Sequence, residues 1–99
     1  MYLTAGHFKF KADSIKRAAE LMNEIVVIGR QETGIHQYAF YLNPEVEQGY
    51  FLFEEWNSKE SHDKHFESDE MQALIPEFFE LLAEPASISY FDATLSSKV

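Results

Sequence analysis

Residues 2–11 read YLTAGHFKFK, and residues 50–56 read YFLFEEW. Both stretches alternate between two faces in the way that a β-strand does. The first stretch carries Tyr2, Thr4, Gly6, Phe8 and Phe10 on one face and Leu3, Ala5, His7 and Lys9 on the other. The second carries Phe51 and Phe53 on one face and Leu52, Glu54 and Trp56 on the other. Neither strand therefore has a polar face, although the solvated face of an antiparallel sheet is normally polar.

The segments that lie between these two strands predict a helix and a further strand. Apolar residues recur with helical spacing from Ile15 to Val26, after Asp13 or Ser14 as the capping residue, and Gly29 marks the expected helix end. Residues 35–42 are rich in strand-forming residues and are followed by an Asn-Pro turn. We therefore expect residues 35–42 and 50–56 to form a hairpin.

Two shorter helical segments and a last strand complete the chain. Asn57 with Glu60, and Asp69 with Gln72, have the spacing of capping boxes. Pro76 lies inside the second helical pattern, where it should kink the helix or restart it. The last strand is expected over residues 86–94. The order is β-α-β-β-α-β, which indicates an α+β, ferredoxin-like split antiparallel sheet with its helices on one face. Residues 1–95 form one expected domain, and residues 96–99 a C-terminal tail.

One face of this sheet has no helical layer. Whichever parity faces the helices, large apolar side chains stay on the uncovered face: Leu3, Ala5, Phe51 and Phe53, or Phe8, Phe10, Leu52 and Trp56. A second copy of the chain, packed sheet against sheet, would cover them. The pattern therefore predicts a homodimer.

Composition excludes several classes of partner. Seventeen acidic residues against eight lysines and arginines give a formal net charge of −9, and no stretch gathers the basic residues into a patch. Nucleic acids and anionic membranes are therefore poor partners. No run approaches the roughly 18 apolar residues that span a bilayer, and the N-terminus has no apolar signal core. We expect a soluble, cytoplasmic protein.

The chain also lacks the usual cofactor motifs. It has no cysteine, which removes disulfides, thiolate nucleophiles and cysteine-ligated metals. His62 and His65 have helical i, i+3 spacing, but no acid–histidine motif accompanies them, so no metal site is expected. One of these two histidines should face the sheet and the other should be more exposed. No glycine-rich nucleotide loop is present, and we expect no cofactor.

Several short motifs occur in a distinctive order. Phe8-Lys9-Phe10-Lys11 closes the first strand, Glu32-Thr33-Gly34 and Tyr38 open the second, and Glu54-Glu55-Trp56 is followed by His65 and Ser68. In this order and spacing the chain resembles the antibiotic biosynthesis monooxygenase family over nearly its whole length. That family comprises dimeric α+β barrels that include quinol monooxygenases, anthrone oxygenases, an autoinducer-processing isomerase and haem-degrading relatives.

The resemblance implies a pocket between sheet and helices in each protomer, lined by Trp56 and His65. It singles out His65, and not His62, as the candidate catalytic base. The chain departs from the family where Thr33-Gly34 is followed by Ile35, because Pro-Gly-Cys is usual there. Haem-degrading members carry an asparagine on the first strand where this chain has Gly6, which argues against haem degradation and leaves haem binding open.

Each candidate residue also has a structural interpretation. Trp56 is equally compatible with stacking on a planar ligand and with anchoring the core. Buried histidines such as His65 commonly hydrogen-bond to a backbone carbonyl. Glu54 shares a strand face with Trp56 and Leu52, and is either a buried acid of raised pKa or a salt-bridge carboxylate. The Tyr38 hydroxyl would contact a substrate oxygen or simply lie at the sheet rim.

The leading functional hypothesis is a cofactor-independent monooxygenase that oxidises a small, electron-rich quinol, phenol or anthrone with dioxygen. His65 would remove the phenolic proton, and Trp56 would shield the substrate ring from water. The other expected substrate contacts are Phe8, Tyr38, Leu52, Glu54 and Phe66. The alternatives are an isomerase of a small phosphorylated signal molecule, which the lack of a basic phosphate clamp disfavours, and a non-catalytic dimer that binds a small ligand.

Overall fold

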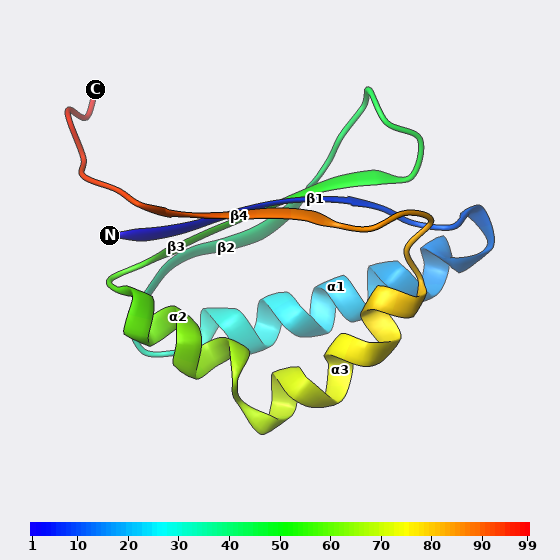
Figure 1. Cartoon of the computed structure of the whole chain (residues 1–99), viewed down its shortest axis with the longest axis horizontal. Coiled ribbons are helices and arrows are strands. Elements are labelled where there is room, and N and C mark those ends of the chain that lie inside the picture. Colours follow the sequence, from blue (N-terminus) through cyan, green and yellow to red (C-terminus); the bar gives the residue numbers. More distant parts are fainter.

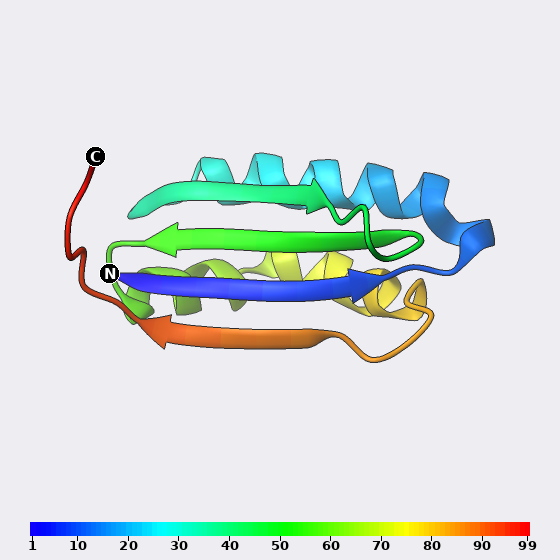
Figure 2. The ribbon, with the colours of Figure 1, turned by 90° about the horizontal axis from the view of Figure 1, so that it is seen from above.

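The computed structural model describes all residues, 1–99, and contains one four-stranded sheet with helices on one face (Figure 1). Its elements are β1 (Tyr2–Lys9), the short 3-10 helix η1 (Ala12–Ser14), α1 (Ile15–Arg30), β2 (Ile35–Leu42), β3 (Gly49–Trp56), α2 (Lys59–Phe66), α3 (Asp69–Glu80) and β4 (Ser87–Asp92). The strands pair antiparallel in the order β2-β3-β1-β4, which Figure 2 shows from above. The predicted α+β, ferredoxin-like class is confirmed. No helix is both long and apolar enough to cross a membrane.

The parity of the strands, which sequence left open, is decided by the helices. The even-numbered residues of β1 and β3 face the helical layer, and from Tyr2 to Phe10 and from Leu52 to Trp56 they are buried. Phe10, Leu21 and Trp56 are among the largest side chains that solvent does not reach. We call this the covered face, and it forms one wall of the hydrophobic core.

The odd-numbered residues of the same strands lie on the other side of the sheet, which we call the open face. Leu3, Ala5, Phe51 and Phe53 are all half-buried there. Ala5 pairs with Phe53 across the central strand pair, and the ring of His7 packs against that of Phe51. Phe91 of β4, next to Leu3, is 50% exposed. The open face therefore carries partly exposed apolar side chains in the single chain, as the sequence indicated, together with the polar side chains of His7 and Glu55.

Three predicted helix features need correction. Helix α1 runs through Gly29 and ends at Arg30, so Gly29 is not the helix end. It is instead a place of close packing, because a Cβ atom there would lie 2.4 Å from the ring of Tyr38. The capping residue of α2 is Ser58, whose hydroxyl accepts a hydrogen bond from the Ser61 amide, and not Asn57. Helix α3 is one helix from Asp69 to Glu80, so it does not restart at Pro76.

Candidate functional site

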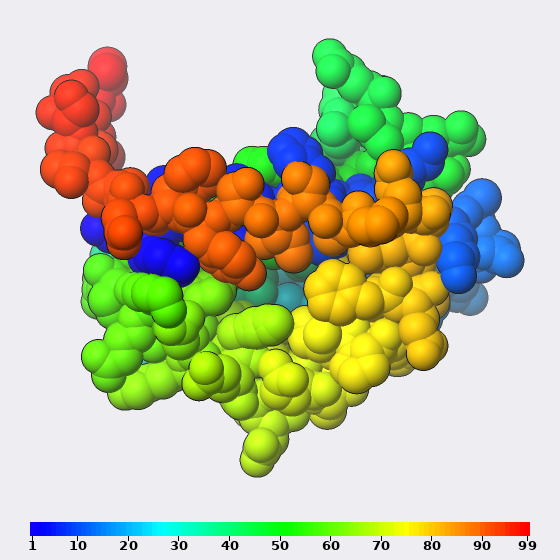
Figure 3. Space-filling model, in the orientation of Figure 1, coloured from blue at the N-terminus to red at the C-terminus, as the bar shows by residue number.

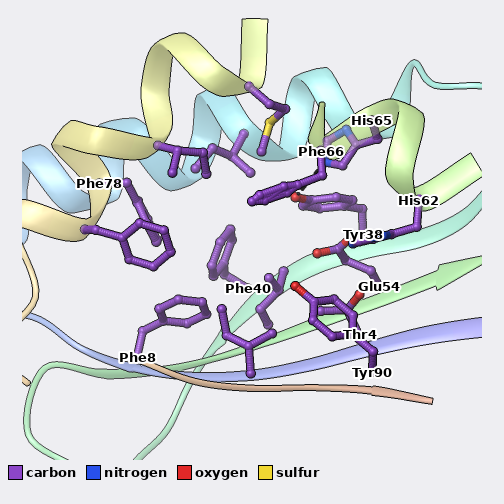
Figure 4. Close-up of a pocket in the computed structure, with 16 residues that line it drawn as sticks. Thr4, Phe8, Tyr38, Phe40, Glu54, His62, His65, Phe66, Phe78 and Tyr90 are labelled. Carbon is purple, nitrogen blue, oxygen red and sulfur yellow. Dashed lines mark hydrogen bonds between the residues drawn. The ribbon is translucent and has the colours of Figure 1, made fainter. Parts of the chain in front are cut away.

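A cavity lies between the covered face and the helices, as Figure 4 shows. Sixteen residues line it, and twelve of them are hydrophobic. Phe8, Phe40 and Phe78 gather at one end, and Thr4 and Glu54 gather at the other (Figure 4). The ring packing is tight, since Phe8 and Phe78 have their centroids 5.4 Å apart in an edge-to-face arrangement. The cavity therefore has an apolar end and a polar end.

The cavity opens to solvent along the edge strand β4. Tyr90 of β4 is 45% exposed and Phe79 of α3 is 40% exposed, although both line the cavity. The space-filling view shows the surface hollowed between β4 and helices α2 and α3 (Figure 3). Its internal volume is about 60 Å³, far below the roughly 300–1,000 Å³ of ordinary ligand pockets. Binding of an aromatic ring would therefore require side chains at this mouth to move outward.

Glu54 is the only acidic side chain in the lining. It extends from β3 on the covered face and is 4% exposed. Its Oε1 accepts a 2.8 Å hydrogen bond from the indole Nε1 of Trp56. Burial raises the pKa of Glu54 to about 7, because the charged form loses its hydration, and the hydrogen bond from Trp56 only partly offsets this. Glu54 is thus a carboxyl group that exchanges a proton near neutral pH.

His65 and Tyr38 form a second buried polar pair. The Nε2 of His65 lies 3.1 Å from the Tyr38 hydroxyl, and its Nδ1 lies 3.6 Å from Oε1 of Glu32. Burial, with a smaller contribution from the charge of His62, lowers the pKa of His65 to about 4. Burial also raises the pKa of Tyr38 well above its usual value. At neutral pH the pair is therefore a neutral imidazole and a neutral phenol.

His62 is also buried, so the two histidines differ in exposure far less than the sequence led us to expect. The exposed fractions are 7% for His62 and 2% for His65. His62 packs among the rings of Tyr2, Trp56 and Tyr90, with its Nδ1 3.0 Å from Oδ1 of Asp63. The two histidines are three residues apart, so they lie on the same side of α2, which packs beneath the sheet (Figure 1).

Most of the predicted site residues lie around the same cavity. These are Phe8, Tyr38, Leu52, Glu54, His65 and Phe66. Trp56 does not line the cavity: it has no exposed surface, and the rings of Tyr38, His62 and His65 pack around it. Its indole therefore has no free face for a ligand, and it acts on the cavity only through its hydrogen bond to Glu54.

Sequence reasoning missed other lining residues, among them Thr4, His62 and Tyr90. Thr4 shares the covered face of β1 with Phe8, so strand alternation was a usable signal for it. Its hydroxyl is buried and has no hydrogen-bond partner in the protein. Tyr90 gave no such signal, because its contribution depends on where β4 pairs with β1. No group of three or more histidine, aspartate or glutamate side chains is arranged to hold a metal ion.

Comparison with known proteins adds to this geometry. The model of the family described as antibiotic biosynthesis monooxygenase matches residues 1–77. An uncharacterized protein of Synechocystis sp. is 27% identical over 89 residues, which are 90% of this chain and 60% of that protein. The chain thus spans about 60% of the length of this relative, which is less than two thirds.

Solved structures share the fold at low sequence identity. The crystal structure of an antibiotic biosynthesis monooxygenase superposes with a TM-score of 0.87 at 20% identity, covering 96% of this chain and all of that one. A protein from Mycobacterium tuberculosis superposes with a TM-score of 0.88 at 20% identity, covering 98% of each chain. Because the family model matches most of the chain, including the strand that carries Glu54 and Trp56 and the helix that carries His65, this protein belongs to the antibiotic biosynthesis monooxygenase family.

Proposed function

We propose that the protein is a cofactor-independent monooxygenase that oxidises a small quinol or anthrone with dioxygen. The observation that carries this proposal is a carboxyl group of near-neutral pKa, Glu54, inside a cavity lined mainly by aromatic and aliphatic side chains. In such a cavity the apolar end would bind a flat ring, and the polar end would contact the hydroxyl group of that ring. A base of this pKa takes a proton efficiently at physiological pH.

The electron balance shows that the proposed reaction needs no added reductant. Oxidation of an anthrone methylene to a carbonyl, or of a hydroquinone to a hydroxyquinone, releases four electrons and consumes one molecule of dioxygen. One oxygen atom enters the product and the other leaves as water. Oxidation of a phenol to a para-quinone balances in the same way. Quinols and anthrones are preferred because the anion of a more electron-rich ring passes an electron to dioxygen more readily.

We assign the proton transfer to Glu54 instead of His65. The pKa of His65 is lowered to about 4, and its Nε2 is within hydrogen-bond distance of Tyr38. A base that weak has little tendency to take a phenolic proton, whereas Glu54 has a pKa of about 7 and lines the cavity directly. His65 then serves to hold Tyr38, whose aromatic ring forms part of the wall.

A pH profile separates these two assignments. Oxygen uptake is measured on a panel of anthrones and hydroquinones, and kcat/KM is followed across pH with a substrate that does not itself ionise in the range. With Glu54 as the base, kcat/KM rises with pH and levels off above about 7, because only the carboxylate accepts a proton. With His65 as the base, the rise would lie near 4.

Matched variants test the same assignment. Glu54→Gln should lower kcat/KM by roughly 10² to 10⁴, while Glu55→Gln, on the open face of the same strand, should leave it nearly unchanged. His65→Gln against His62→Gln tests the alternative base in the same way. Normal turnover by Glu54→Gln would exclude Glu54 as the base, and failure of the wild type on the whole panel would favour a non-catalytic binding protein.

An isomerase of a phosphorylated signal molecule is less well supported. No lysine or arginine lines the cavity, and the polar groups that do line it are a carboxyl, a threonine hydroxyl, two histidines and two tyrosine hydroxyls. A phosphate group would bring two negative charges next to Glu54 without a cation to offset them.

We also propose that the protein works as a homodimer packed through the open face. Leu3, Phe51 and Phe53 form an apolar patch at the centre of the sheet, and Phe91 extends it over β4. Light scattering on the wild type should give twice the chain mass at micromolar concentration. Phe53→Asp should give a monomer that keeps its circular dichroism spectrum, because its side chain does not enter the core. A monomeric wild type would rule this assembly out.

A further inference from the structure

Four polar side chains form one row across the covered face of the sheet. Tyr38 of β2 pairs with Glu54 of β3, Glu54 pairs with Thr4 of β1, and Thr4 pairs with Tyr90 of β4. Directly paired residues in an antiparallel sheet have Cβ atoms about 4.5–5.5 Å apart. All four line the cavity. We call them the polar row, and Figure 4 shows Thr4, Glu54 and Tyr90 gathered at one end.

The members of the polar row differ in whether their polar atoms are paired within the protein. The Tyr38 hydroxyl lies against His65, and Glu54 accepts a hydrogen bond from Trp56. Thr4 is 1% exposed, and its hydroxyl has no hydrogen-bond partner in the protein. Burying a hydroxyl without a hydrogen bond is unfavourable, and valine has the same shape and a high strand propensity. A threonine at this position costs stability unless something in the cavity bonds to it.

The position of Thr4 beside Glu54 indicates what that partner would be. An oxygen atom between the two side chains would be within reach of both, because the reach of two hydrogen bonds matches the spacing of paired residues. Glu54 would accept its proton, and the Thr4 hydroxyl would donate to the same oxygen. A donor fixed at the point where negative charge develops stabilises an oxyanion without any rearrangement.

We propose that Thr4 Oγ1 donates a hydrogen bond to the ligand oxygen whose proton Glu54 removes, so that an ionisable aromatic hydroxyl lies between these two residues. This rests on the proposed function in that Glu54 is the acceptor. The ring of the ligand then extends toward Phe8, Phe40 and Phe78. The ligands that fit are phenolic or enolic oxygens on the edge of a flat ring, and the same ring with a methyl group in place of the hydroxyl fits less well.

Binding of two matched probes tests the proposal without any turnover. The probes are 4-nitrophenol and 4-nitrotoluene, which differ by hydroxyl against methyl. Binding is followed by quenching of Trp56, the single tryptophan, which donates to Glu54. Thr4→Val should bind nitrophenol roughly ten- to a hundredfold more weakly than the wild type, with nitrotoluene binding almost unchanged. Thr4→Ser, which keeps the hydroxyl, should bind nitrophenol nearly as well as the wild type.

Two further measurements distinguish a contact between Thr4 and the ligand from a structural role of Thr4. The absorbance of bound nitrophenol reports how much of it is ionised at a given pH, and that fraction should fall in Thr4→Val because the donor is lost. The melting temperature of ligand-free Thr4→Val should equal or exceed that of the wild type, because the hydroxyl it removes is unpaired. A protein that uses Thr4 structurally would show the reverse pattern, with lower stability and equal weakening of both probes.

The outcomes are distinct from those that test the monooxygenase proposal. Equal nitrophenol affinity in the wild type and Thr4→Val overturns the inference, as does a wild type that binds no nitrophenol at millimolar concentration. Selective weakening in Thr4→Val supports it even where the wild type consumes no oxygen with any quinol or anthrone. Oxygen consumption together with unchanged nitrophenol binding in Thr4→Val overturns the inference alone.

Discussion

Neighbouring residues of β3 meet opposite environments on the two faces of one sheet. Glu54 is buried on the covered face, while Glu55, the next residue, is half-buried on the open face. The helices exclude water from the covered face, and this burial raises the pKa of a carboxyl group there. No helical layer of the chain covers the open face (Figure 1). In our proposals, one side of the strand supplies the group that accepts a proton, and the other side forms the homodimer interface.

The largest expected contrast between the faces concerns stability. Phe10 on the covered side has no exposed surface and packs edge-on against Tyr50 and Phe78. Phe10→Ala should lower the free energy of unfolding by about 3–5 kcal/mol, measured by urea denaturation. Phe51→Ala, on the open face, should cost clearly less at a fixed protein concentration. It should also weaken the concentration dependence of unfolding that the proposed wild-type dimer should show. Equal losses from both variants would break the distinction between the faces.

Burial on the covered face gives Glu54 and His65 opposite effects on stability against pH. The pKa of Glu54 is raised from 4.5 to about 7, so the folded state holds a proton that the unfolded chain has released between those values, and stability falls as pH rises across that window. The pKa of His65 is lowered from 6.5 to about 4, so stability falls as pH drops across that window. Each pKa shift changes the free energy of unfolding by up to about 3 kcal/mol across its window.

These opposing slopes should largely cancel between about 4.5 and 6.5 in the wild type. Glu54→Gln removes one slope, so the free energy of unfolding should fall on acidification more than in the wild type. His65→Gln removes the other, so the free energy of unfolding should rise on acidification relative to the wild type. Urea unfolding across pH measures both, with Glu55→Gln as the control from the open face. Parallel curves for all variants would show that neither group titrates with a shifted pKa.

A smaller effect tests the close packing behind the covered face. Replacing glycine by alanine inside a helix ordinarily stabilises it by roughly 0.5–1 kcal/mol. At Gly29 the added Cβ would lie 2.4 Å from the Tyr38 ring, so Gly29→Ala should instead destabilise the protein by about 1–3 kcal/mol. Thermal unfolding gives the sign, and Asn23→Ala, at an exposed position of the same helix, is the control. A stabilised Gly29→Ala would mean that the ring moves freely.

The smallest effect concerns the start of α2, the helix that carries both buried histidines. Ser58→Ala removes the hydroxyl that accepts from the Ser61 amide and should cost about 1 kcal/mol. Asn57→Ala should cost less, because the side chain of Asn57 contacts His36 and does not cap the helix. Comparison of the two melting temperatures checks this, and a larger loss for Asn57→Ala would restore the capping box expected from sequence.

Much of the candidate site was accessible from sequence because strand alternation is local. Leu52, Glu54 and Phe8 were placed on their faces by a period of two, and all three line the cavity. The roles within the site were harder to predict. The indole of Trp56 lies behind Glu54. The proton affinities of Glu54 and His65 depend mainly on how deeply the helices bury these side chains. His62 is the more exposed of the two histidines, as expected, but the sequence did not indicate that both would be buried.

The sequence by itself determined the order of strands and helices, the two chemically distinct faces of each strand, and the absence of cysteine chemistry, because these depend only on residue type and spacing along the chain. The tertiary structure alone decided which face the helices cover and which residues meet across the sheet. Tyr38, Glu54, Thr4 and Tyr90 come from four strands and stand in one row only through strand register. Register is a long-range property, and no local pattern encodes it.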